Sequence, residues 1–494
     1  MLKITQYTAI LPIIFFPFLT GLSHLSKSKI NDFTYFKMES ANQYLPVETD
    51  NEHYLFLPVL MSPHRKSPQV NVPYFENEIR YPETAISWFG RVTPIENYVD
   101  MRLGYNDHEL FVHVTIFDRR LWYDISPSVE SLTDWDAITL YLDLAGGKGE
   151  SPSMLTYRFV AQLNWWEQRD NWQAAYRGNG QGWQIANISF TSNSGWRGNA
   201  PNDDVDDRGW TMGFRIPFES LGLSETPPTG SVWGLALSLH DRDDSAGTPI
   251  ADKYWPASAD TLKPNSWGRI HFGLPVYSTP PVEPDGTVII RHGLDGIQVV
   301  DVHVGGSFNC GDPFAPTFFD GWGDANYAGS SQVNVQNQSD VADWPCFSKY
   351  FLTFPLDSIP PGKVILSAAL KLHLFGNSGQ GWQPEPQPSL IQVLTVEENW
   401  DESTITWNNA PPAFENIART WVYPVDEFPG WPGIPYEWDV SAAVSQAYNN
   451  GELLRLVVYS ADAAIHSGKY FVSSDTEEWN AAARPTLELV WGQP

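Results

Sequence analysis

The chain has 494 residues, and its 58 acidic side chains against 30 lysines and arginines give a formal net charge of −28. A surface this acidic repels nucleic acid, anionic lipid and polyanionic sugars, so nucleic acid is not an expected partner. The length exceeds that of one all-β core and predicts two domains after a leader, while 39 prolines and 37 glycines predict many turns and little helix.

Residues 1–30 have the pattern of an export signal. Lys3 precedes an apolar run over residues 9–22 that is short for a bilayer span. We therefore predict a signal peptide, a secreted or cell-surface-associated extracellular protein, and no membrane insertion beyond this segment. Whether the signal is cleaved stays open, because no small-x-small site follows it. The polar residues 31–69 are predicted to be a spacer.

Residues 70–275 alternate apolar and polar side chains in short runs, which is the pattern of strands. The clearest passage is residues 98–118, where two alternating runs flank a polar turn and predict an antiparallel hairpin. Further strands are predicted around Leu140, Phe159, Phe214 and Leu237. Because no long stretch has helical period, this region is predicted to be an antiparallel β-sandwich.

A dense aromatic stretch within this region is the first candidate binding site. Tryptophan rings can stack on the apolar faces of sugars, and neighbouring amide, arginine and carboxylate groups can bond the hydroxyls. The candidate ligand contacts are Trp165, Trp166, Trp172, Trp183 and Arg169. The alternative is a hairpin whose rings cover the sandwich and touch no ligand.

Two acidic loops form a second candidate site, for calcium, which prefers several carboxylate and carbonyl oxygens. Asp204 and Asp206 lie in one loop, and Asp241 and Asp243 follow a predicted strand. Neither loop has EF-hand spacing, and solvated loop charge is the alternative. Calcium is the one cofactor that the sequence suggests.

The strand passages of this region also resemble a known family. "VDMRLGYNDHELFVHVTIFD", "DWDAITLYLDL", "GWTMGFRIPFESLGL" and "WGRIHFG" occur in the order seen in carbohydrate-binding module family 9-like domains, which share a fold with the DOMON group. The resemblance implies a β-sandwich that binds sugar or, in other families of this fold, haem. Under that alternative the candidate haem ligand is Met101 or His113.

A proline-rich linker over residues 276–284 precedes a second predicted sandwich at residues 285–494. "KYFLTFPLDSIPPGKVILSAALKLHL" predicts two strands around a Pro-Pro-Gly turn, and "RPTLELVW" predicts a closing strand. Residues 397–412, which include Trp400 and Trp407, are predicted to form another strand between two loops. The predicted fold class is therefore all-β, with two antiparallel, jelly-roll-like β-sandwich domains in tandem.

In that order these runs resemble the DNRLRE-type domain, also catalogued as carbohydrate-binding module family 96. Trp322 lies in "GWGDANYAGSSQVNV", which resembles an early motif of the family, and Trp382 lies in a Gly- and Pro-rich insertion. These two are the candidate ligand contacts of this domain, and Trp431 lies in a second loop of the same kind. The domain is sparse in lysine and arginine, which disfavours an acidic polysaccharide as ligand.

The only cysteines are Cys310 and Cys346, both in the second predicted domain. In a secreted chain we predict a disulfide between them, with two separate buried thiols as the alternative.

No catalytic motif is evident: there is no Gly-x-Ser-x-Gly elbow, no His-Glu-x-x-His and no phosphate-binding loop. The predicted function is that of a secreted, non-catalytic protein that holds polysaccharide by aromatic stacking and hydrogen bonds. The alternatives are a structural or adhesive cell-surface protein that binds other proteins, a haem-binding DOMON-like protein, and a glycan-active enzyme whose carboxylate pair has no sequence signature. Exposed tryptophans in a flat patch would favour the adhesive alternative, and the oligomeric state stays open.

Overall fold

The computed structural model describes residues 67–494 except 166, 307–317, 339–345, 380–384, 463 and 465–466, together with the short strands β1 (Val47–Glu48) and β2 (Tyr54–Leu55). The chain divides into two compact units, Met1–His64 and Arg65–Pro494. The predicted signal peptide lies outside the described residues. All that follows concerns the second unit, in which none of the described helices is long and apolar enough to cross a membrane.

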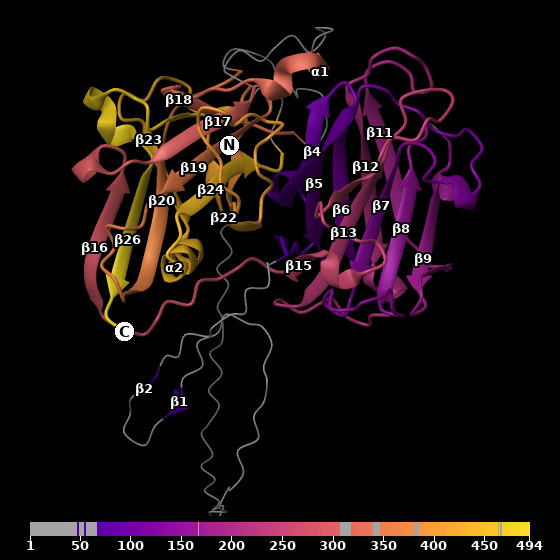
Figure 1. Ribbon diagram of the computed structural model, residues 1–494, viewed down its shortest axis with the longest axis horizontal. Coiled ribbons are helices and arrows are strands. Elements are labelled where there is room, and N and C mark those ends of the chain that lie inside the picture. Colours follow the sequence, from indigo (N-terminus) through magenta and orange to yellow (C-terminus); the bar gives the residue numbers. More distant parts are fainter. Residues whose placement is uncertain are drawn as a thin grey trace, which may run out of the picture. The chain divides into compact units, whose positions relative to one another are not determined.

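The first group of strands, indigo to magenta in Figure 1, forms a sandwich of two sheets around one hydrophobic core. One sheet has the order β11-β12-β6-β5-β4 and comprises β4 (Ala85–Thr93), β5 (Glu96–Tyr105), β6 (Glu109–Phe117), β11 (Thr191–Arg197) and β12 (Gly209–Pro217). The facing strands are β3 (Gln69–Val72), β7 (Ala137–Asp143), β8 (Thr156–Gln162), β9 (Gln173–Gly178), β10 (Trp183–Ile185), β13 (Val232–His240), β14 (Lys253–Trp255) and β15 (Gly268–Phe272).

The second group of strands, rose to yellow in Figure 1, encloses a second core. One sheet contains β16 (Pro284–Arg291), β18 (Gln332–Val335), β20 (Val364–Asn377), β23 (Ile434–Asp439), β25 (Lys469–Val472) and β26 (Thr486–Gly492). The other strands are β17 (Val300–Gly305), β19 (Ser348–Phe354), β21 (Ser389–Thr395), β22 (Glu415–Val422) and β24 (Leu454–Ser460). Two α-helices accompany them among the described residues, α1 (Phe318–Gly321) and α2 (Ser441–Asn450).

Short 3-10 helices lie in the loops. Those described are η1 (Tyr81–Glu83), η2 (Val129–Ser131), η3 (Arg169–Asn171), η4 (Phe218–Leu221), η5 (Pro264–Ser266), η6 (Leu294–Gly296), η7 (Trp322–Asp324) and η9 (Glu478–Ala483). The predicted all-β fold class is confirmed, and so is the hairpin at residues 98–118, where β5 and β6 pair antiparallel.

The strand predicted at residues 397–412 is wrong, because this stretch is a series of turns between β21 and β22. The side chain of Asp401 accepts a hydrogen bond from the backbone N–H of Ser403 at 2.9 Å, and its backbone carbonyl accepts one from Ile405 at 2.9 Å. Such local bonds from an aspartate fold the chain back on itself and compete with a ladder of strand bonds.

β3 joins the sheets of the two sandwiches. It pairs in parallel with β15, and at Gln69 it also meets Glu415 of β22. Two asparagines reinforce this edge reciprocally: the backbone N–H of Asn71 donates to Asn416 Oδ1 at 2.7 Å, and Asn416 Nδ2 donates to the Asn71 carbonyl at 2.9 Å. The β3 edge is therefore hydrogen-bonded on both sides.

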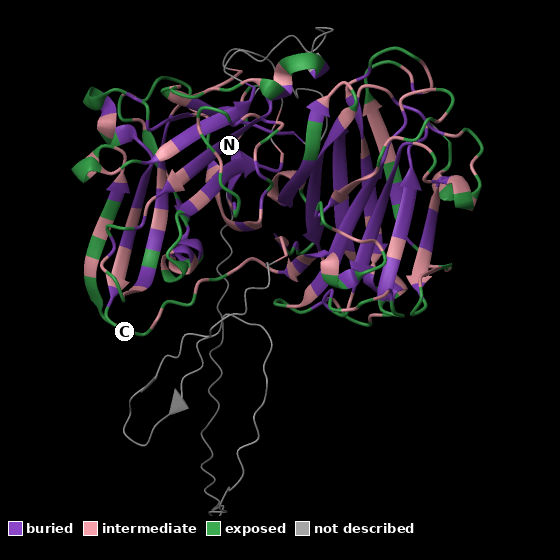
Figure 2. Ribbon diagram, viewed as in Figure 1, coloured by how far each residue is buried: buried purple, intermediate pink, exposed green. Residues whose placement is uncertain are grey.

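A third hydrophobic core lies between the two sandwiches. It is built from Ile86, Trp88, Tyr98 and Phe117 of the first and Val304, Phe351, Trp407, Val457 and Tyr459 of the second. β5 consequently has two buried faces, since Met101 points into the first core while Tyr98, on the alternate side, points into the third. Figure 2 shows the result as strands that are buried along most of their length.

Candidate functional site

An exposed group of aromatic rings on the second sandwich is the strongest candidate binding surface. Phe428, Trp431 and Trp479 are 57%, 42% and 64% exposed, although large apolar side chains usually avoid water. Phe375 of β20 and Tyr470 of β25 lie beneath them. We call these five residues the aromatic patch.

The three exposed rings of the aromatic patch meet at steep angles, whereas Phe375 is tilted by 37° to Trp431. Trp431 meets Trp479 at 5.6 Å between ring centroids and 78° between ring planes, and it meets Phe428 at 5.1 Å and 69°. The edge of one ring therefore contacts the face of the next, which is a favourable aromatic geometry. The result is an exposed aromatic corner, where the rings present faces in different directions.

Two glycines explain how the loop presents Trp431. Gly430 and Gly433 both have positive φ, 81° and 101°, which other residues rarely adopt. A Cβ on Gly433 would lie 2.6 Å from the carbonyl oxygen of Leu374, so only glycine lets this loop close onto β20. Trp431 stands between the two glycines.

Acidic groups border the aromatic patch. Trp479 Nε1 donates a hydrogen bond to Glu477 Oε2 at 3.0 Å, and Glu478 Oε1 pairs with Arg484 Nη2 at 2.8 Å. Ring faces can stack on the C–H groups of a sugar, while carboxylate oxygens accept hydrogen bonds from its hydroxyls. The two elements of a sugar site are thus adjacent.

Of the two C-terminal candidates named from sequence, neither is shown to join the aromatic patch. Trp382 lies outside the described residues. Trp322 is half-buried in η7 and meets Trp407 at 4.9 Å and 61°, in the core between the sandwiches. Trp322 thus packs against this core, and its predicted ligand role stays a prediction. Phe428 and Trp479 were missed, because a lone aromatic residue in a loop carries no distinguishing pattern.

The N-terminal aromatic candidates do not form one site. Trp172 is only 5% exposed, belongs to the first core, and donates from Nε1 to the Asp124 carbonyl at 2.7 Å, so its predicted ligand role is corrected to a core role. Trp165 packs on Trp196 at 4.9 Å, whereas Trp183 stacks parallel to Trp267 at 6.5 Å and 8°.

Strand register separates Trp165 from Trp183. Trp183 pairs with Gly178 at the end of β9, whereas Trp165 follows the end of β8 that pairs with the start of β9. They therefore lie toward opposite ends of this short strand. Trp166 lies outside the described residues.

Arg169 is also committed to the fold. Its guanidinium donates to Ser192 Oγ at 3.0 Å, to Asn164 Oδ1 and to the Trp172 carbonyl at 3.3 Å. Burial lowers its pKa to about 10. These bonds hold η3 against β11, so the predicted ligand role of Arg169 has no free donor geometry to support it.

The acidic residues named from sequence separate into two kinds. Asp206 is ion-paired to Arg119 Nε and Arg120 Nη2, each at 2.9 Å, and Asp204 is exposed in the same loop. A calcium site at Asp204 and Asp206 is therefore not supported by their geometry. Asp243 is half-buried, and burial raises its pKa to about 6.

Asp241, by contrast, joins two carboxylates that were not predicted. Carboxylate oxygens of Asp118, Asp136 and Asp241 all lie within 4.8 Å of one another. We call these residues the aspartate triad. A signal for them existed, since Asp118 ends the apolar run of β6 and Asp136 begins that of β7.

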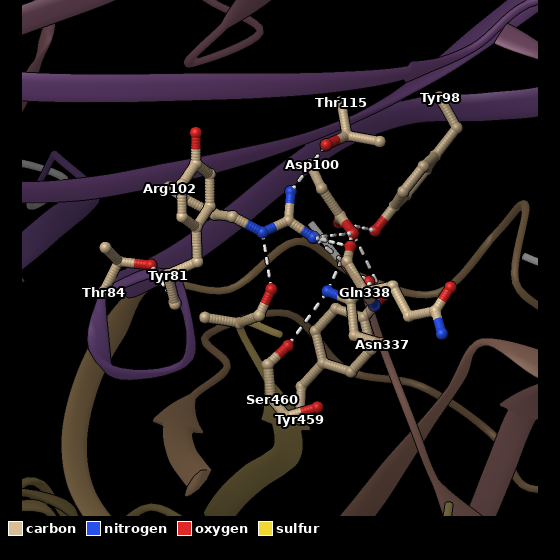
Figure 3. A network of polar contacts seen from close by, with 11 residues as sticks. Tyr81, Thr84, Tyr98, Asp100, Arg102, Thr115, Asn337, Gln338, Tyr459 and Ser460 are labelled. Atoms are coloured by element: carbon tan, nitrogen blue, oxygen red, sulfur yellow. Dashed lines mark hydrogen bonds and ion pairs between the residues drawn. The ribbon is translucent and has the colours of Figure 1, made fainter. Parts of the chain in front are cut away.

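A polar network crosses the boundary between the two sandwiches (Figure 3). Asp100 accepts hydrogen bonds from Tyr98 Oη at 2.6 Å, Asn337 Nδ2 at 2.9 Å and Tyr459 Oη at 3.1 Å. Arg102 lies 3.6 Å from Asp100 and donates to Thr115 Oγ1 and to the carbonyls of Gln338 and Ala461. All of this charge is buried.

Lys349 lies in an aromatic cage within the same interface. Its Nζ is 3.6 Å from the ring centroid of Trp407, 4.3 Å from Trp88, 4.4 Å from Tyr98 and 5.3 Å from Tyr459. No hydrogen bond reaches this Nζ, and burial lowers its pKa well below the usual value. Because no ligand can reach these fully buried groups, we assign the network and the cage to cohesion of the two sandwiches.

The haem candidates are both packed inside protein. In the β5–β6 register Met101 pairs with Val114 and His113 with Arg102, which places Met101 and His113 on opposite faces of the sheet. Met101 is in the first core, and His113 meets the ring of Tyr81 at 5.0 Å. The two cannot ligate one iron from these positions.

Cys346 is buried and disulfide-bonded. Its predicted partner, Cys310, lies outside the described residues, so the pairing stays a prediction.

Comparison with known proteins finds a family match within the second sandwich. Residues 313–489 match carbohydrate-binding module family 96. The resemblance predicted for the C-terminal region is thereby confirmed, and all five residues of the aromatic patch fall within the family 96 match. No curated protein is similar to the chain.

Similar solved structures include a family 9 carbohydrate-binding module from Caldicellulosiruptor kristjanssonii in complex with cellotriose, with 17% identity and a TM-score of 0.30 over 44% of this chain and 100% of the module. The same module in complex with glucose has 16% identity and a TM-score of 0.30 over 43% and 100%. A protein from Bacteroides uniformis, described as carbohydrate-binding, has 13% identity and a TM-score of 0.32 over 42% and 100%.

Proposed function

We propose that the chain is a secreted, non-catalytic carbohydrate-binding protein that holds a neutral polysaccharide on the aromatic patch. The observation that carries the proposal is the exposed Trp431–Trp479 pair, set beside carboxylates within the family 96 region. Stacking of sugar faces on the two rings supplies affinity, and hydrogen bonds from hydroxyls to carboxylates such as Glu477 supply orientation.

The charge of the protein narrows the class of polysaccharide. A net charge of −28, with Glu477 and Glu478 at the edge of the aromatic patch, repels uronic-acid and sulfated chains. We therefore expect neutral glucans, xylans or mannans to bind in preference to pectin or alginate. The signal pattern of residues 1–30 and the disulfide bond of Cys346 support the proposal that the protein is exported.

The experiment that tests the proposal is a pull-down of the full chain on a panel of insoluble and immobilised polysaccharides, neutral and acidic, with release of soluble sugar assayed in parallel. We expect retention on at least one neutral polymer and no release. Binding to none of them would shift weight to the adhesive alternative, for which exposed aromatic rings serve as a protein-binding surface. Sugar release would identify an enzyme.

A further inference from the structure

The aspartate triad buries three carboxylates in one place and has no part in the proposed glycan binding. Asp118, Asp136 and Asp241 are almost completely buried, and Asp241 is only 2% exposed. Three carboxylates in one dry site need a counter-charge or bound protons.

Hydrogen bonds anchor two of the three carboxylates of the aspartate triad. Asp136 accepts from the backbone N–H groups of Trp122 at 2.7 Å and Arg242 at 2.9 Å. Asp118 accepts from the backbone N–H of Arg120 at 3.1 Å and from Trp210 Nε1 at 3.0 Å. These four donors fix the two carboxylates in place and use only part of their accepting capacity.

Asp241 differs from the other two carboxylates, because its oxygens have no hydrogen-bond donor. Both of its carboxylate oxygens are buried and neither has a hydrogen-bond partner. An ionised carboxylate in that state costs several kcal/mol, on the order expected for an unpaired buried charge. One Asp241 oxygen lies within 4.8 Å of an oxygen of each anchored carboxylate, so a cation positioned among the three would give it a partner.

No protein cation fills this role among the described residues. Lys253 Nζ lies 3.5 Å from Glu96, and the side chains of Arg119 and Arg120 pair with Asp206. Arg242 Nη1 donates to the backbone carbonyl of Asp241 and not to its carboxylate oxygens. No ion pair joins a lysine or arginine of this part of the chain to the triad.

The spacing of the oxygens fits one particular class of ion. Two ligands on the same cation are separated by at most twice the metal–oxygen distance, which is about 4.6–5.2 Å for calcium and about 4.0–4.2 Å for magnesium. One oxygen of each triad carboxylate lies within 4.8 Å of the other two, an upper bound that is compatible with calcium. An all-oxygen, carboxylate-rich set also suits a hard cation and not zinc or copper.

We propose that the aspartate triad is a calcium site that ties the two sheets of the first sandwich together. Asp136 and Asp241 flank paired ends of β7 and β13, where Ala137 is opposite His240, and Asp118 follows β6 in the facing sheet. An ion held by all three bridges the sheets at one end of the sandwich. The site is independent of the proposed glycan binding, since the aromatic patch lies in the second sandwich.

The test is thermal unfolding of the full chain after removal of divalent ions with EDTA, followed by return of calcium or magnesium. Calcium at about one hundred times its Kd should raise the unfolding midpoint by about 5 °C, and magnesium should raise it less. Isothermal titration should show one site. The calcium assignment is overturned by an equal effect of magnesium, and the site itself by the absence of calcium binding.

The variants Asp241→Asn and Asp204→Asn form a matched pair. D241N should lose the calcium-dependent rise, while in EDTA its midpoint should equal or exceed that of the wild type, because one of three repelling charges is gone. A merely structural role of Asp241 predicts the opposite in EDTA, a lower midpoint. D204N removes an exposed loop charge and should respond to calcium like the wild type; loss of the response in D204N alone would move the site to that loop. If D241N does not fold, Asp118→Asn replaces it.

Discussion

Two groups of aromatic residues in this protein have the same chemistry and opposite surroundings. The cage around Lys349, with Trp88, Trp407 and Tyr459, is closed between the two sandwiches, whereas Trp431 and Trp479 of the aromatic patch face water. The first group covers apolar surface and the buried amino group of Lys349, whereas the second leaves ring area exposed to water. The comparison teaches that the abundance of tryptophan, 22 residues in all, serves both cohesion and recognition, and that burial separates the two roles.

The same substitution should have very different effects in the two groups. Trp407→Ala opens a cavity in the core between the sandwiches and should lower the free energy of unfolding by about 3–5 kcal/mol. Trp431→Ala removes an exposed ring and should cost less than about 1 kcal/mol. Chemical denaturation of both variants measures the difference, and equal costs would remove the distinction between the groups.

The buried network should be nearly as sensitive as the cage. Asp100→Ala leaves Arg102 buried without its carboxylate, so we expect a loss of about 3–5 kcal/mol in the free energy of unfolding. Asp285→Ala is the control, because its pair with Lys363 at 3.5 Å is partly exposed, and it should cost less than about 1 kcal/mol. If D100A unfolds with nearly the same free energy as the wild type, the network contributes little to the cohesion of the two sandwiches.

Lys349→Met tests whether burial of the Lys349 amino group destabilises the folded protein. Lys349 Nζ is buried without a hydrogen bond, which is unfavourable. An apolar side chain of similar length should therefore raise the free energy of unfolding by about 1–4 kcal/mol near neutral pH. The pKa of Lys349 is lower in the folded protein than in the unfolded chain, so the unfolded chain binds more protons below about pH 10.

It follows that acidification from about pH 10 should destabilise the wild type relative to K349M, by up to about 1.4 kcal/mol per pH unit. The advantage of K349M should therefore shrink as the pH rises toward 10. A pH-independent difference, measured by denaturation across this range, would show that the four rings hold Lys349 in its charged form.

The strands of both sandwiches were predictable because alternation of apolar and polar residues reports one buried face. The second buried face of β5 was not. Tyr98, Asp100 and Arg102 are the polar-side residues of that alternation, and their partners Asn337 and Tyr459 lie more than two hundred residues away. The alternation predicts which residues share a face of the strand, whereas only the tertiary structure shows what covers that face.

The sequence predicted that aromatic residues form the candidate site, but it did not predict which ones. Tryptophan density pointed to residues 165–183, yet Trp172 is in the core, because density does not distinguish packing from display. Trp431 had a better local signal in its flanking glycines, since Gly430 and Gly433 permit a tight exposed turn. For Trp479 and Phe428 no local pattern exists, and their grouping depends on loops that meet only after folding.

The measurement that tests the central claim most directly is affinity electrophoresis in gels that contain graded amounts of whichever neutral polysaccharide retains the wild type. The double variant Trp431→Ala/Trp479→Ala is compared with Trp183→Ala, a half-buried ring of the first sandwich. We expect at least a ten-fold higher Kd for the double variant, about 1.4 kcal/mol, and less than a two-fold change for W183A. Unchanged affinity in the double variant with a loss in W183A would contradict this expectation and place the glycan on the first sandwich.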